Sequence, residues 1–106
     1  MKEEEKFINF VQSHPEYYKL FPQSPDESNL YLSFLEFLKG KAQTLEQLFQ
    51  RFPGIASKDM HFILEYLEKI KLIERIPAGN KVFYYATDLA RKLLDEYSKT
   101  WHDFRF

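Results

Sequence analysis

Segment 55–94 constrains the fold more than any other part of the chain, because two different periodicities follow each other within it. Apolar residues first recur at helical spacing, and Ser57 stands where it would cap a helix that we expect over residues 57–71. The buried stripe of that helix would be Met60, Ile63, Leu64, Leu67 and Ile70. Alternating β-rich residues then flank the turn sequence 77–80, which predicts a hairpin of strands 72–76 and 81–86.

Four further helices complete the prediction, one after the hairpin and three before segment 55–94. Thr87 is placed to cap the last helix, and its predicted inner face is Leu89, Leu93, Leu94 and Tyr97. Upstream, we expect helices over 3–13 and 29–39, separated by a proline-punctuated loop over 22–28, with Gly40 as the stop of the second. Thr44 and Gln47 form a capping-box pattern that opens a helix before the Pro53–Gly54 turn.

Length and composition place these elements in one domain with an extension at each end. The chain has 106 residues and is 44% hydrophobic, with 11 Phe and 7 Tyr, so it can bury a substantial core. Residues 1–27 hold three Lys against six acidic residues, whereas 28–100 hold eleven Lys or Arg against nine. We therefore expect an N-terminal helix and linker over 1–27, a mildly basic domain over 28–100 and an aromatic tail over 101–106.

The order of elements over residues 28–98 resembles the winged helix-turn-helix domain of MarR-like, ArsR-like and PadR-like transcription regulators. Two segments carry this resemblance: LEYLEKIKLI, which is similar to the end of that family's recognition helix, and VFYYAT, which is similar to its second wing strand. The family usually has Gly where Lys71 stands, so Lys71 is expected to adopt an unusual backbone angle. The resemblance implies a mainly α fold with five helices and a two-stranded wing, and double-stranded DNA as the partner.

The residues facing DNA can be assigned once the buried stripe is fixed. We expect Ser57, Lys58, His61 and Phe62 on helix 57–71 to face base edges, with Phe62 placed to touch a thymine methyl group. Phosphate contacts are assigned to Lys41, Arg75 and Lys81. The same helix also carries Asp59 and Glu65 on its outer side. This acidic and aromatic surface supports an alternative function, a winged-helix protein-interaction module without sequence-specific DNA binding.

The aromatic ends of the chain predict a second interface. Strand alternation puts Phe83 and Tyr85 on the face opposite Val82, Tyr84 and Ala86. Both ends are rich in aromatic residues, which either pack on their own domain or form a homodimer interface, and we favour the homodimer. The expected dimer contacts are Phe7, Phe10, Val11, Tyr97 and Trp101.

Several classes of function find no support in the sequence. There is no cysteine, His14, His61 and His102 form no metal-binding motif, and a phosphate-binding loop and a nucleophile elbow are both missing. We therefore expect no enzyme activity, no metal and no cofactor. The acidic N-terminus does not match a secretory signal and no apolar run is long enough for a membrane span, so a cytoplasmic protein is expected.

Overall fold

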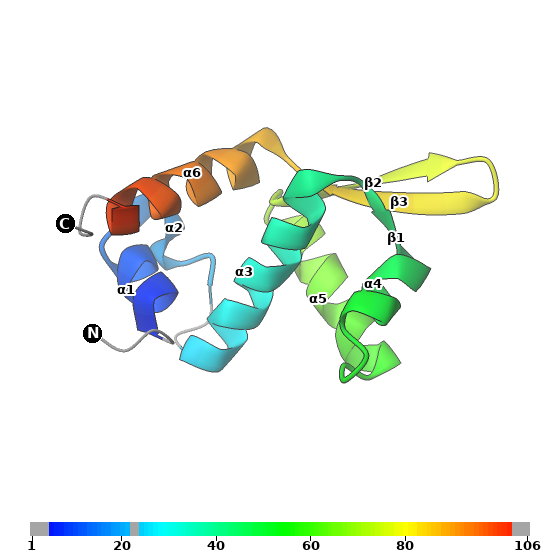
Figure 1. Ribbon diagram of the computed structural model, residues 1–106, viewed down its shortest axis with the longest axis horizontal. Coiled ribbons are helices and arrows are strands. Elements are labelled where there is room, and N and C mark those ends of the chain that lie inside the picture. The colour runs from blue at the N-terminus through cyan, green and yellow to red at the C-terminus, as the bar shows by residue number, and fades with distance from the viewer. Residues whose placement is uncertain (1–4, 22–23, 103–106) are drawn as a thin grey trace.

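The computed structural model describes residues 5–21 and 24–102, and for residues 101–102 it describes the backbone only. The described chain contains six helices and a three-stranded antiparallel sheet in the strand order β1-β3-β2 (Figure 1). The prediction of a mainly α protein with a hairpin wing is confirmed. The helix beyond the five predicted is the single turn α2 (Pro15–Tyr18), which was not predicted as a separate element.

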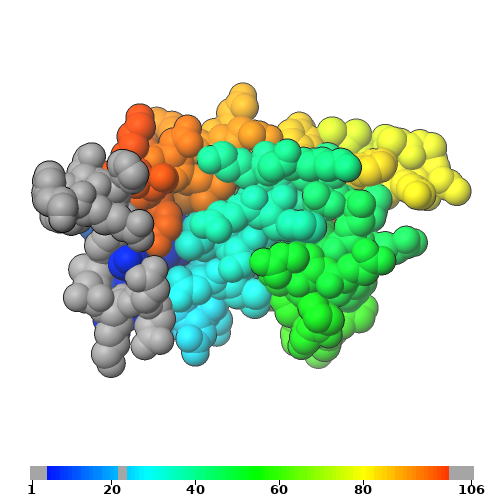
Figure 2. Space-filling view, viewed as in Figure 1, coloured from blue at the N-terminus to red at the C-terminus, as the bar shows by residue number. Residues whose placement is uncertain are grey.

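The winged-helix part runs from α3 to β3. It consists of α3 (Pro25–Gly40), β1 (Gln43–Thr44), α4 (Leu45–Arg51), α5 (Ser57–Lys69), β2 (Ile73–Ala78) and β3 (Lys81–Ala86). The sheet gains β1, which pairs through Gln43 with Tyr84 and through Thr44 with Phe83 and was not expected from the sequence. The hairpin projects from one end of the molecule, beyond α4 and α5 (Figures 1 and 2).

Helix α3 begins four residues before the predicted start at Asn29. The loop expected over 22–28 is therefore wrong in its second half, while residues 22 and 23 lie outside the described part. Pro25 occupies the first turn, where a missing amide hydrogen costs nothing, and Asp26 and Glu27 favour the positive end of the helix dipole. The proline and the acidic residues that suggested a loop are also the residues that start a helix.

The starts of α4 and α5 are set by residues close to them in the sequence. The capping box of α4 is confirmed, since the backbone N–H of Gln47 donates to Thr44 Oγ1 at 3.2 Å and that of Thr44 donates to Gln47 Oε1 at 2.8 Å. The cap of α5 is Ala56 rather than the predicted Ser57, which instead occupies the first helical position. The stripe of Met60, Ile63, Leu64 and Leu67 is buried as expected, and Ile70 is half-buried.

Just past the end of α5, Lys71 adopts the left-handed conformation, with φ of 65°, which confirms the unusual backbone angle predicted for it. The amide of Lys71 donates to the carbonyl of Glu68 at 3.0 Å, and that of Leu72 donates to the carbonyl of Leu67 at 2.9 Å. These two bonds are those of a Schellman motif, whose left-handed position normally holds glycine. Leu67 and Leu72 are both fully buried, so the apolar contact of the motif fixes the exit from α5 into β2.

The wing turn is shorter than predicted, because Pro77 and Ala78 belong to β2 and only Gly79 and Asn80 connect the strands. Gly79 has φ of 66°, the positive angle that the first central residue of a type II′ turn requires. Pro77 is tolerated because β2 is an edge strand. Hydrogen-bonded and non-hydrogen-bonded residue pairs alternate along the hairpin, and Pro77 stands in a non-hydrogen-bonded pair, so its nitrogen points away from β3. Val82 shares its face of β3 with the buried Tyr84 and Ala86 but is 37% exposed, because it lies out on the wing.

At the other end of the molecule, α1 (Lys6–Gln12), α2 and α6 (Asp88–His102) enclose an aromatic cluster. Phe7 and Phe10 pack edge-on against Tyr97, with ring centroids 5.2 and 5.3 Å apart, and Tyr17 stacks on Phe10. The hydroxyl of Tyr17 donates to Glu96 at 3.1 Å. One continuous core joins this cluster to the buried stripes of α3 and α5.

The last helix is capped as predicted, since the backbone N–H of Ala90 donates to Thr87 Oγ1 at 3.3 Å. Leu93 and Leu94 are buried and Tyr97 packs against the core. The prediction for Leu89 is wrong: its side chain is 41% exposed, because the buried stripe of α6 begins at Ala90 and Leu89 lies to one side of that stripe, next to the base of the wing.

Candidate functional site

The surface assigned to DNA is made of the outer side of α5 and the projecting hairpin. Ser57, Lys58, His61 and Phe62 are all exposed, and Phe62 leaves 63% of its surface open to solvent. Helical periodicity sets Phe62 nearly opposite the buried stripe. The outermost ridge of the helix, which we call the α5 ridge, consists of Lys58, Phe62, Glu65 and Lys69.

The N-terminus of α5 has no side-chain cap, and its first turn carries Asp59 as well as Lys58. Ala56 has no side-chain oxygen with which to cap, so the first amides of α5 point outward without a side-chain acceptor from that residue. Lys58 stands beside these amides, and its charge adds to the positive end of the helix dipole. Such an arrangement suits a phosphate group.

The phosphate-facing candidates are exposed but differ in their surroundings. Lys41 follows the end of α3, and Lys81 begins β3 directly after the wing turn. Arg75 is engaged with α5, because its Nε lies 3.7 Å from Glu68 Oε1. Both side chains of this pair are partly exposed, at 56% and 39%, so the contact is weak and can be exchanged for another partner.

The charge on this surface is mixed rather than uniformly positive. Asp59 and Glu65 are exposed on α5, and Glu68 and Glu74 flank Arg75. The sequence showed these acids but not the Glu68–Arg75 contact, which depends on how the left-handed residue Lys71 turns β2 back along α5. A protein with this surface gains less from phosphate neutralisation than one with a continuous basic band.

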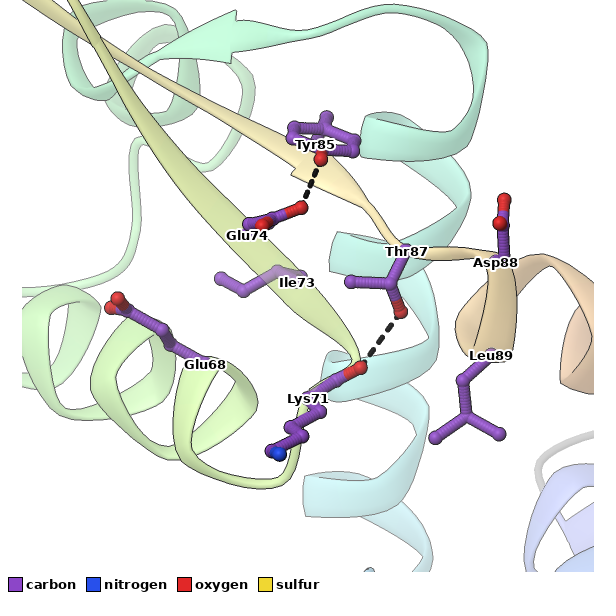
Figure 3. Close-up of a pocket in the computed structure, with 8 residues that line it drawn as sticks. All are labelled: Glu68, Lys71, Ile73, Glu74, Tyr85, Thr87, Asp88 and Leu89. Carbon is purple, nitrogen blue, oxygen red and sulfur yellow. Dashed lines mark hydrogen bonds between the residues drawn. The ribbon is translucent and has the colours of Figure 1, made fainter.

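A groove of about 650 Å³ lies where α5, the wing and α6 meet (Figure 3). Each of these elements lines the groove with one acidic residue: Glu68 on α5, Glu74 on the wing and Asp88 on α6. Tyr85 donates a hydrogen bond to Glu74, and this bond raises the pKa of the Tyr85 phenol. Thr87 Oγ1 donates to the carbonyl of Lys71 at 2.7 Å, which ties the start of α6 to the end of α5.

A second groove, of about 420 Å³, runs between α5 and the first turns of α3. Its apolar lining includes Leu30, Ile55 and Phe62, and its acidic lining is Glu27 and Asp59. On the wing, Phe83 and Tyr85, which lie on the face opposite Tyr84 and Ala86, are half-buried. Neither groove was anticipated from the sequence, because each is built from elements that are distant along the chain.

The residues assigned to a dimer interface lie mostly inside the chain. Phe7, Phe10 and Val11 are at most 2% exposed, so in this conformation they offer no surface to a second copy. Tyr97 is half-buried against them, and the side chain of Trp101 lies outside the described part. The packing of these aromatics on their own domain was the other possibility that the sequence left open.

Neither a cluster of three metal-binding side chains nor a membrane-spanning helix is found among the described residues. Within residues 5–21 and 24–100, no three His, Asp or Glu side chains gather closely enough to hold a metal ion. His14, which precedes α2, is held by α1, since its Nδ1 lies 2.7 Å from the carbonyl oxygen of Phe10. In the described part of the chain, no helix is both long and apolar enough to cross a membrane.

Comparison with known proteins finds a likeness among solved structures only. No protein-family model and no curated protein matches the chain. A solved structure that resembles it is an ArsR-like transcriptional regulator from Rhodococcus sp. RHA1. The TM-score is 0.49 and the identity 16%, with 94% of this chain and 82% of that chain covered. The fold assignment rests on the element order and strand register described above.

Proposed function

We propose that this protein is a DNA-binding transcription regulator that contacts duplex DNA with α5 and the wing. The observation that carries the proposal is the first two turns of α5, where Ser57, Lys58, His61 and Phe62 are all exposed beside a projecting hairpin. A helix presented in this way fits a major groove, while a hairpin beside it reaches the adjacent backbone. Lys81 on the wing and the open N-terminus of α5 supply phosphate contacts.

The mixed charge of the surface sets the expected strength of binding. With few cations per chain and Arg75 engaged by Glu68, we expect nonspecific binding no tighter than about micromolar at physiological salt. The dissociation constant should rise steeply with salt, because each neutralised phosphate releases counterions.

A salt titration of a labelled random-sequence duplex tests this proposal. Lys81→Glu should weaken binding to all sequences alike, since the wing touches backbone only. The matched control is Lys92→Glu, which makes the same charge change on the exposed side of α6. A DNA-binding protein of the proposed kind loses affinity in the first variant far more than in the second, whereas equal losses would contradict the assigned surface.

A second function, a protein-interaction module, is favoured by one observation. Asp59 and Phe62 line the groove between α5 and α3 together with Glu27 and Leu30, an acidic and apolar surface that suits a peptide better than a phosphate backbone. The same titration separates the two functions. If no duplex binds even at low salt, the interaction module takes the place of the regulator.

The homodimer and the division into an extension, a domain and a tail stay predictions. Because Phe7, Phe10 and Val11 are internal, a dimer would use other surfaces near α1 and α6. Sedimentation at micromolar concentration should give twice the 12.8 kDa chain mass, and a monomer at that concentration would refute the dimer.

A further inference from the structure

Phe62 stands out among the large apolar side chains of the described residues. It is 63% exposed, whereas the next most exposed, Tyr18, is 45% exposed. The aromatic residues near the N-terminus are used mainly to build the core, but the ring of Phe62 contributes little to it. It occupies the middle of the α5 ridge, with Lys58 one turn before it and Glu65 one turn after it.

The charged residues along the α5 ridge suggest which of its positions would contact DNA phosphates and which would contact bases. Lys58 and Lys69 stand at its two ends, roughly 16 Å apart at the rise of an α-helix, a span comparable with the roughly 12 Å width of the major groove. Glu65 lies between them and is repelled by phosphates. The ends of the ridge therefore suit the phosphate walls of the groove, and the middle suits the base edges on its floor.

Thymine carries the apolar group that matches an aromatic ring on that floor. Its C5-methyl group projects into the major groove, where the other base edges present mainly hydrogen-bond donors and acceptors. We propose that Phe62 packs on thymine methyl groups and makes thymine-containing steps the preferred target of this protein. This inference rests on the proposed DNA-binding function and names the base chemistry that its central residue recognises.

Replacing thymine by uracil removes the methyl group and leaves the hydrogen-bonding groups in place, so it isolates the proposed contact. The duplexes are those selected by the wild-type protein from random sequence, synthesised once with thymine and once with uracil. We expect uracil at the contacted position to weaken wild-type binding about fourfold, the worth of one buried methyl group. Phe62→Ala should bind the two duplexes equally, because the ring and the methyl group act as one contact.

The matched control is Tyr18→Ala, which removes an exposed aromatic side chain from α2 and should keep the fourfold preference for thymine. Thermal unfolding of both variants checks that the fold is retained. If the wild type binds thymine and uracil duplexes equally, or if Phe62→Ala keeps the preference, the inference is overturned while DNA binding stands. If no duplex binds at low salt, the proposed function itself fails, and this inference with it.

Discussion

The two ends of this molecule use aromatic and apolar side chains in opposite ways. At one end, Phe10 contacts the rings of Phe7, His14, Tyr17 and Tyr97 and is almost completely buried. At the other end, Phe62 on α5 and the wing residues Ile76 and Val82 remain between 37% and 63% exposed. The first end stabilises the fold, and the second presents apolar groups to solvent among charges of both signs. A large aromatic residue therefore indicates function in this chain only where the fold leaves it uncovered.

Truncating one phenylalanine from each end should separate the two roles most strongly. Phe10→Ala removes a ring from a packed cluster and should lower the free energy of unfolding by about 3–5 kcal/mol. Phe62→Ala, at an exposed position, should change it by about 0.5 kcal/mol or less. Urea unfolding of the two variants measures both values, and similar losses would mean that the exposed ring also supports the fold.

Alkaline pH should weaken the aromatic end selectively. Burial and the hydrogen bond to Glu96 raise the pKa of Tyr17 from 10.0 to about 12. A raised pKa means that the folded state favours the neutral phenol, so this contribution to stability is complete below pH 10 and is lost as the pH rises through 12. The loss should be smaller in Tyr17→Phe, and unfolding curves with the same pH dependence in both proteins would argue against it.

How far the sequence predicts each end depends on the range of the interactions involved. Features that depend on neighbouring residues were predicted correctly. They are the Thr44–Gln47 capping box, the Thr87 cap and the left-handed Lys71, each of which follows from residues within a few positions. Pro25 failed as a loop signal because proline serves both a loop and the first turn of a helix. Leu89 was placed inward because the helical spacing of the sequence includes it, but the buried stripe of α6 is Ala90, Leu93 and Leu94, and Leu89 lies outside it.

Interactions between distant segments could not be read from the sequence. The contact of Tyr17 with Glu96 joins residues 79 positions apart, so the sequence suggested excess aromatic surface but not what would cover it. The exposure of the residues assigned to base edges followed from periodicity on a single helix. The contact of Arg75 with Glu68 did not follow from the sequence, because it requires the angle between α5 and β2.

Relieving the strain at the end of α5 gives a smaller effect. Lys71→Gly places the preferred residue in the left-handed position of the Schellman motif and should stabilise the protein by about 0.5–1 kcal/mol. Lys69→Gly, at the last residue of α5 and with ordinary helical geometry, should instead destabilise it by up to about 1 kcal/mol. Thermal unfolding distinguishes the two, and destabilisation by both would show that the side chain of Lys71 contributes more than its backbone angle costs.

The smallest expected change concerns the charges around Arg75. Glu68→Gln removes the exposed pair with Arg75 and should tighten binding to a labelled duplex about two- to threefold, since such pairs are worth less than about 1 kcal/mol. Asp95→Asn removes a similar exposed pair, with Lys39 at 3.5 Å, which joins α6 to the end of α3 rather than to α5 or the wing, and it should leave duplex binding unchanged. Equal effects would indicate a response to net charge alone.

The most direct test of the central claim is a nuclear magnetic resonance titration of the 12.8 kDa protein with duplex DNA at low salt. If α5 and the wing form the binding surface, backbone amide signals from residues 57–65 and 79–82 should shift progressively. Signals from α1, α2 and the second half of α6 should stay in place. Shifts concentrated at the aromatic end, or the absence of any shift at saturating duplex, would contradict the assignment of function to α5 and the wing.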